Sequence, residues 1–144
     1  MEKENLQYLK SKINERINRF TKRRDCYRKK SLYIFLIISI LSAVTSVVLG
    51  LNISGCEETL RIIALIISGI VTVVSAYNAF FDNKQMWINY NNTLNEFYKL
   101  NFEIEFAEKS NAINEEMILK FKKDYQTILG KFNSQWTDLR KKEN

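Results

Sequence analysis

The sequence predicts an all-α membrane protein, in which a two-helix transmembrane hairpin is joined to long amphipathic cytoplasmic helices that form a helical bundle. Two stretches, 31–53 and 61–81, are apolar and contain a single charged residue, Arg61, at the edge of the second. Most charged residues lie toward the two ends of the chain. Proline is absent and glycine occurs only four times, which favours long unbroken helices.

Each apolar stretch is expected to cross the membrane once. The hydrocarbon core of a bilayer is about 30 Å thick, and a helix of about 20 residues crosses it. Within that core every backbone amide must be paired inside its own segment, so we expect helices and not strands. Residues 54–60 suffice only to reverse the chain, and we expect them to form a short outer loop.

The basic residues predict the orientation. Residues 1–30 contain eleven basic and four acidic side chains, whereas Arg61 is the one basic residue near the loop. Basic segments flanking a span remain on the cytoplasmic side, so we expect a multi-pass protein with both termini in the cytoplasm. Part of this excess forms a basic cluster expected at the membrane surface: Lys22, Arg23, Arg24, Arg28, Lys29 and Lys30.

The cytoplasmic segments show helical periodicity. In residues 1–30, apolar side chains from Leu6 to Phe20 recur at helical spacing, and we expect this helix to continue into the first span. Residues 82–144 are predicted to form a helical hairpin with a break at 108–114. The proposed packing face of its first helix is Trp87, Tyr90, Leu94 and Phe97, continued by Asn101.

The second helix of this hairpin is expected to begin after Asn114, whose side chain can cap it. Its apolar stripe comprises Ile118, Phe121, Tyr125, Ile128, Phe132, Trp136 and Leu139. Two such faces are suited to an antiparallel pair.

Small residues recur along both spans and predict close helix packing or a pore lining. In the second span they are Ala64, Ser68, Thr72, Ser75 or Ala76, and Ala79; in the first they are Ser39, Ala43 or Ser42, Ser46 and Gly50. Two explanations remain open: packing of the two spans against each other, or contact with other copies of the chain. Neither span contains an acidic or basic residue at depth, which argues against an ion-coupled carrier.

We do not expect an enzyme. Histidine is absent, which removes the side chain that most often acts as a near-neutral acid or base or as a metal ligand. The carboxylates of Glu103, Glu105 and Glu108 are interpreted as a solvated surface. No motif predicts a cofactor or a metal site, and the basic excess is explained by topology without nucleic acid.

The arrangement resembles the SLATT family, two-transmembrane effector domains associated with nucleotide-second-messenger and related bacterial conflict systems. The resemblance covers about residues 10–110. It rests on Arg23-Arg24-Asp25-Cys26-Tyr27-Arg28, on the tight hairpin, and on Gln85-Met86-Trp87-Ile88-Asn89-Tyr90 followed by Thr93-Leu94 and Phe97. Relatives usually carry an Arg and a Glu where this chain has Asn91 and Asn95.

The resemblance implies an oligomeric effector of the bacterial inner membrane. It would permeabilise or disrupt that membrane in an anti-phage or conflict system, with a sensor or nucleotide synthase encoded nearby as its partner. The alternative is a non-enzymatic membrane scaffold that recruits a cytoplasmic partner through its helical bundle.

Overall fold

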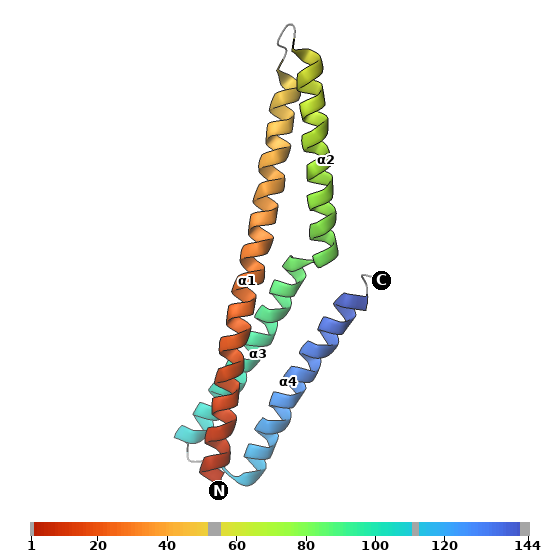
Figure 1. Cartoon of the computed structure of the whole chain (residues 1–144). Coiled ribbons are helices and arrows are strands. Elements are labelled where there is room, and N and C mark those ends of the chain that lie inside the picture. Colours follow the sequence, from red (N-terminus) through yellow and green to blue (C-terminus); the bar gives the residue numbers. More distant parts are fainter. Residues whose placement is uncertain (1, 52–55, 111–112, 142–144) are drawn as a thin grey trace. The chain divides into compact units, whose positions relative to one another are not determined.

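The computed structural model describes residues 2–51, 56–110 and 113–141 of the chain. Four α-helices account for nearly all of them, and no described residue lies in a strand. The all-α fold class is therefore confirmed. The helices are α1 (Glu2–Gly50), α2 (Glu57–Phe81), α3 (Asn83–Lys109) and α4 (Glu115–Lys141) (Figure 1).

Helix α1 is continuous from Glu2 to Gly50, as predicted from the sequence. Neither proline nor glycine occurs in this segment before Gly50, so no residue interrupts the ladder of backbone hydrogen bonds. The amphipathic N-terminal part and the first apolar stretch are therefore one helix.

Helix α2 begins earlier than the sequence indicated. Residues Glu57–Leu60 were expected in the outer loop but form the first turn of α2; positions 52–55 lie outside the described residues. Two carboxylates in the first turn, those of Glu57 and Glu58, stabilise the positive end of the helix dipole. The helix ends where Asp82 adopts a left-handed conformation with φ of 33°, which aspartate tolerates better than most residues.

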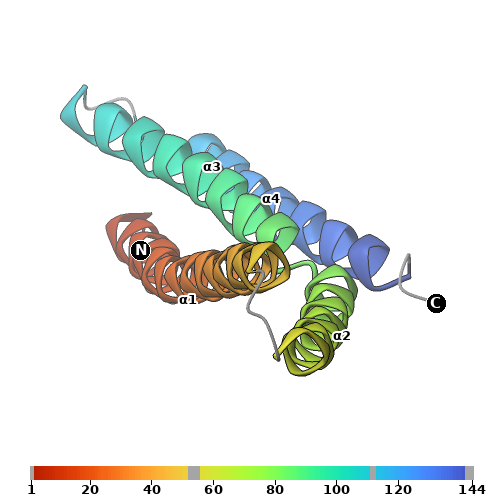
Figure 2. The ribbon, with the colours of Figure 1, turned by 90° about the horizontal axis from the view of Figure 1, so that it is seen from above.

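Helices α3 and α4 run antiparallel, as both views of the ribbon show (Figures 1 and 2). The predicted cap of α4 is confirmed, because the backbone N–H of Met117 donates to Oδ1 of Asn114 over 2.8 Å. Helix α3 extends to Lys109, so its last turn includes residues that were expected in the break.

The chain divides into two compact units. Unit 1 comprises residues 1–26 and 85–144, and unit 2 comprises residues 27–84. In unit 1 the N-terminal part of α1 packs with α3 and α4 around one apolar core. Its buried side chains are Leu6, Leu9, Ile13, Ile17, Phe20, Tyr90, Leu94, Phe97, Leu100, Ile104, Ala107, Phe121, Ile128 and Phe132.

The ring of Phe20 lies at the centre of an aromatic group in this core. Its centroid is 4.8 Å from that of Phe132, 5.3 Å from that of Tyr90 and 5.7 Å from that of Phe97, all in edge-to-face geometry. Such pairs contribute about 0.5–1.5 kcal/mol each beyond the burial of their area. The group therefore joins α1 to both α3 and α4, which follow much later in the sequence.

Most of the predicted packing face of α3 lies in this core. Tyr90, Leu94 and Phe97 are buried, whereas Trp87 is half-buried. On α4, the stripe is buried at Phe121, Ile128 and Phe132, but Trp136 is 37 % exposed. Ile118, Tyr125 and Leu139 are half-buried, so the stripe is covered best in its middle.

Unit 2 contains the parts of the chain that are apolar enough to cross a membrane. Two helices meet the criteria of length and composition, one within α1 and one that begins at Glu57. In the most apolar window of the first no residue is buried, and α2 buries only Ala64. Insertion of these helices into a membrane stays a prediction.

Candidate functional site

The packing face between α1 and α2 is formed mainly by aliphatic residues. In unit 2 the partly covered side chains recur at steps of three and four along both helices, the spacing of helices whose axes cross at a small angle. Among them are Ile34, Ile38, Leu41, Thr45 and Val48 on α1, and Leu60, Ala64, Ile67, Val71, Val74 and Ser75 on α2. These side chains set which face of each helix remains free.

The small residues predicted on α2 are divided by this packing. Ala64 is buried and Ser75 is half-buried, so both belong to the packing face with α1. Ser68, Thr72 and Ala79 are exposed. The Thr72 hydroxyl donates to the Ser68 carbonyl oxygen over 2.9 Å, so this polar group is already paired within its own helix. Packing against α1 accounts for only part of the predicted row.

On α1 the row of small residues is not covered at all. Ser39, Ala43, Ser46 and Gly50 are all exposed, and they lie on the side of the helix opposite Ile38 and the other residues that pack on α2. A Cβ added at Gly50 would meet no heavy atom within 4 Å. These small residues are therefore exposed on the surface of α1 and do not take part in its packing against α2.

The basic cluster surrounds α1 and is not confined to one face. Lys22, Arg23, Arg28, Lys29 and Lys30 are exposed, and successive residues on a helix point about 100° apart. Arg24 differs, because its guanidinium pairs with the Asp25 carboxylate over 3.0 Å. A basic cluster that surrounds the helix on all sides is suited to a helix that passes through a layer of anionic head groups.

One carboxyl group near the cluster has a perturbed pKa. The Glu15 carboxylate accepts a hydrogen bond from the Arg19 guanidinium and a weaker one, of 3.3 Å, from the Lys12 ammonium. These two cations, Arg19 first, lower the pKa of Glu15. The group is fully exposed on the first half of α1, and the pairs hold together neighbouring turns of that helix.

Sequence reasoning missed an exposed aromatic row on α3. Tyr98, Phe102 and Phe106 are 48 %, 67 % and 66 % exposed, and the rings of Phe102 and Phe106 stack with centroids 6.4 Å apart. The signal was present as apolar residues at i, i+4 and i+8. It was overlooked because the adjacent row through Leu94 and Phe97 has the stronger apolar pattern.

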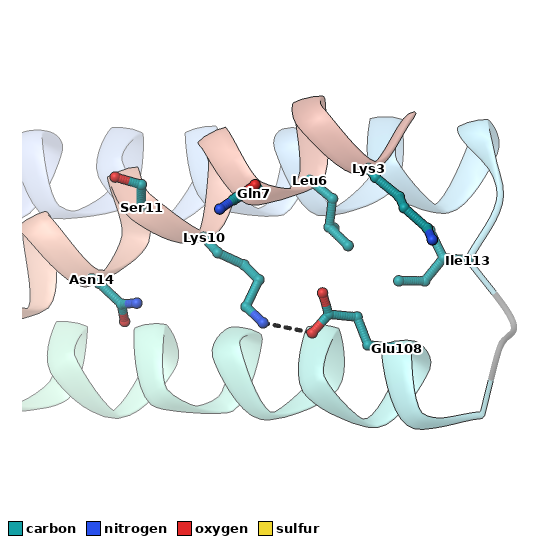
Figure 3. Close-up of a pocket in the computed structure, with 8 residues that line it drawn as sticks. All are labelled: Lys3, Leu6, Gln7, Lys10, Ser11, Asn14, Glu108 and Ile113. Atoms are coloured by element: carbon teal, nitrogen blue, oxygen red, sulfur yellow. Dashed lines mark hydrogen bonds and ion pairs between the residues drawn. The ribbon is translucent and has the colours of Figure 1, made fainter. Parts of the chain in front are cut away.

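A hollow of about 720 Å³ opens between the first turns of α1 and the end of α3 (Figure 3). The Lys10 ammonium and the Glu108 carboxylate meet across it at 2.5 Å, so each neutralises the charge of the other. Its remaining lining is polar or aliphatic, with Gln7, Ser11, Asn14, Leu6, Ile113 and Lys3. No nucleophile with an adjacent base lines this hollow.

The carboxylates predicted to form a solvated surface do not gather into a cluster that could bind a metal. Glu105 accepts a hydrogen bond of 2.9 Å from Asn101 Nδ2, while Glu108 pairs with Lys10. Among the described residues no group of three or more acidic, histidine or cysteine side chains is placed to hold a metal ion. The Oδ1 atom of Asn101 is buried without a hydrogen-bond partner in the same part of the chain.

The comparison with known families identifies one match. Residues 17–99, more than half of the chain, match the profile of the family described as "Protein of unknown function (DUF4231)". This range contains the basic cluster, both helices of unit 2 and the first part of α3, but not α4. Neither a curated protein nor a solved structure matches the chain. The chain therefore belongs to the DUF4231 family.

Proposed function

We propose that this chain is an oligomeric effector of the bacterial inner membrane. It crosses the membrane twice with both termini in the cytoplasm, and its assembled copies permeabilise or disrupt the membrane in an anti-phage or conflict system. The resemblance to the SLATT family supports this role, and under it the trigger comes from a sensor or nucleotide synthase encoded nearby.

Membrane insertion is supported by the surface of unit 2. Large apolar side chains are exposed along both helices, among them Val73 at 70 %, Phe35 at 68 % and Leu65 at 66 %. A soluble protein rarely exposes a continuous apolar surface of this extent, whereas in lipid the same side chains are solvated. Exposed aromatic rings at Tyr33, Tyr77 and Phe81 lie toward the basic end of the helices, where such rings favour the interface.

The main support for assembly is that the small residues Ser68, Thr72 and Ala79 of α2 are exposed. In lipid, helices associate through close backbone approach at small residues, because apolar side chains gain nothing by leaving the hydrocarbon. A row of small residues that is not used within the chain is available to other copies. Its hydroxyl groups would give a pore only a weakly polar lining.

The test is expression in bacteria from a tightly controlled promoter, with membrane potential followed by a voltage-sensitive dye. High expression favours assembly by mass action and replaces the trigger. We expect depolarisation by the natural chain and its loss in Ser68→Leu and Thr72→Leu. The matched control is Val73→Leu, an exposed residue outside the row, which should depolarise as the natural chain does.

Two outcomes would contradict the proposal. Depolarisation that persists in Ser68→Leu and Thr72→Leu would exclude this row as the contact between copies. A natural chain that inserts fully but leaves the potential unchanged would exclude permeabilisation by assembly alone and favour the scaffold.

A further inference from the structure

A second hollow, of about 470 Å³, lies between α1 and α4 within unit 1. Its volume falls within the range of sites that bind small molecules, about 300–1,000 Å³. The core leaves two of its apolar side chains uncovered, because Tyr8 is 66 % and Leu119 is 58 % exposed. The lining residues are Asn5, Tyr8, Leu9 and Lys12 from α1, and Ile118, Leu119, Lys122, Tyr125 and Gln126 from α4. We call this site the α1–α4 hollow.

Helices α1 and α4 run in the same direction along the α1–α4 hollow (Figure 1). The Arg16 side chain contacts Tyr125, and further along both helices Phe20 contacts Phe132. Lining residues that come early in α1 therefore lie beside those that come early in α4. The hollow consequently has an apolar end, with Tyr8, Leu9, Ile118 and Leu119, followed by a basic end, with Lys12 and Lys122.

The basic end gathers positive charge from both helices. Lys122 is exposed and has no ion pair within the part of the chain that the structure describes. The Lys12 ammonium lies 5.6 Å from the centroid of the Tyr8 ring, so this cation is next to the apolar end. The Arg16 guanidinium adjoins the lining, because its Nε donates to the Tyr125 hydroxyl over 3.3 Å.

Carboxylates nearby do not cancel this charge. Among the described residues no carboxylate lines the hollow. The Glu15 carboxylate pairs with Lys12 at 3.3 Å, but it is shared with Arg19. Asp124 lies two turns before Lys131, which forms an ion pair with α3, so Asp124 is on the edge of α4 that faces away from the hollow.

The charges around the hollow also set the orientation of an anionic ligand. Glu4 and Glu115 are exposed and lie one turn before Tyr8 and Leu119, beyond the apolar end and outside the lining. They repel an anion at that end, whereas the lysines attract it at the other. A ligand with one anionic head and one apolar chain matches both ends in a single direction.

We propose that the α1–α4 hollow binds the anion of a long-chain fatty acid. The carboxylate accepts charge-assisted hydrogen bonds from Lys12 and Lys122, and the chain covers the exposed surface of Leu119 and Tyr8. Burial of apolar surface contributes about 25 cal/mol per Å². The inference uses side chains of unit 1 alone and does not depend on the proposed function.

The size of the hollow argues for this occupant. A volume in the lower half of the range for small-molecule sites has room for one chain and a small head group. A stable interface with another protein needs about 800 Å² on each partner, which far exceeds the surface that Tyr8 and Leu119 leave uncovered.

The test is photo-labelling of the full chain in detergent with a palmitate analogue that carries a diazirine at the end of its chain. Labelled peptides are identified by mass spectrometry. We expect saturable labelling of the segments around Tyr8 and Leu119. Palmitate should compete for this labelling, whereas hexadecanol, which lacks the carboxylate, should compete much less.

Variants separate recognition of the head from recognition of the chain. Lys12→Gln combined with Lys122→Gln should reduce the labelling at least about tenfold, because both charge-assisted hydrogen bonds are lost. The matched control is Lys99→Gln, at an exposed lysine of α3, which should label as the natural chain does. Leu119→Glu should abolish the labelling, whereas Phe102→Glu, at an exposed apolar residue outside the hollow, should retain it. All these positions are exposed, so the variants are expected to fold.

Three outcomes would overturn the proposal. Hexadecanol that competes as well as palmitate would show that the carboxylate is not recognised. Labelling confined to the apolar helices of unit 2, or reduced equally in Lys99→Gln and in the double variant, would show that the α1–α4 hollow is not the site. A photo-reactive amino acid at position 119 that forms an adduct with another protein or a second copy in cells would show that the hollow is a protein-docking surface instead.

Discussion

The ring of Phe20 in α1 lies edge-on to the ring of Phe132 in α4, with 4.8 Å between their centroids. Phe20 is 6 % exposed and also touches rings from α3. Replacement by alanine removes contacts with all three partners and leaves a cavity, which for a buried phenylalanine costs about 3–5 kcal/mol.

We therefore expect Phe20→Ala to destabilise unit 1 strongly. Both tryptophans, Trp87 and Trp136, belong to unit 1, so tryptophan fluorescence during denaturant unfolding of the detergent-solubilised chain reports on this unit alone. The matched control is Phe102→Ala, at an exposed ring, which should shift the free energy of unfolding by about 0.5 kcal/mol or less. Equal losses in the two variants would contradict the core position of Phe20.

The cap of α4 gives a second prediction. The Asn114 side chain accepts a hydrogen bond from the Met117 backbone N–H, so Asn114→Ala should lower the free energy of unfolding by about 1 kcal/mol. Asn114→Asp retains an acceptor and should preserve stability. The fluorescence assay measures both. Asn133→Ala, at an exposed position inside α4, is the control and should be neutral or slightly stabilising.

The two cysteines test the orientation. Cys26 and Cys56 are both exposed free thiols, and the expected topology places them on opposite sides of the membrane. A membrane-impermeant maleimide applied to spheroplasts should label Cys26→Ser, which retains Cys56. It should label Cys56→Ser only after lysis. The reverse pattern would place the termini outside the cytoplasm.

Acid should weaken the ion pairs around Glu15. Hydrogen bonding to Arg19 and then to Lys12 lowers the pKa of Glu15 in the folded chain. A group with a lowered folded pKa stabilises the fold above its ordinary pKa and loses that contribution as pH falls through the folded value. Glu15→Gln should therefore lower the thermal midpoint slightly at pH 7, and the difference between the two proteins should shrink as the pH falls through the folded pKa of Glu15.

This difference should also shrink in high salt, because the group is fully exposed and salt screens its partners. A difference between Glu15→Gln and the natural chain that stays constant as the pH is lowered, and that salt leaves unchanged, would show that the charge of Glu15 is not its cause.

The sequence was sufficient for helix type and for most of the core. Long apolar runs, helical periodicity from Leu6 to Phe20 and the absence of proline left few alternatives to long helices. The start of α2 was missed because Glu57 and Glu58 resemble loop residues by polarity, although acidic side chains stabilise the first turn of a helix.

The candidate surfaces were only partly predictable. Ser68 and Thr72 were identified as a row, but which side of α2 faces α1 depends on how larger residues such as Ile38 and Ile67 fit together. Similarly, α3 carries two adjacent heptad rows, and tertiary packing decides that Phe97 is buried and Phe102 is exposed. Periodicity within one helix contains no information about the shape of its neighbour.

The core of unit 1 joins α1 to α4, although the rest of the chain between them is translated in the meantime. The Arg16 side chain, for example, donates to the Tyr125 hydroxyl across 109 positions of the chain. Translation proceeds at about 5–20 residues per second. The apolar face of α1 therefore remains without α4 for roughly 5–20 s, while the residues between the two helices are synthesised. During this interval the apolar face of α1 has no partner helix, and the membrane surface or a chaperone must cover it. A chain truncated before α4 would keep this apolar face exposed and would be susceptible to proteolysis.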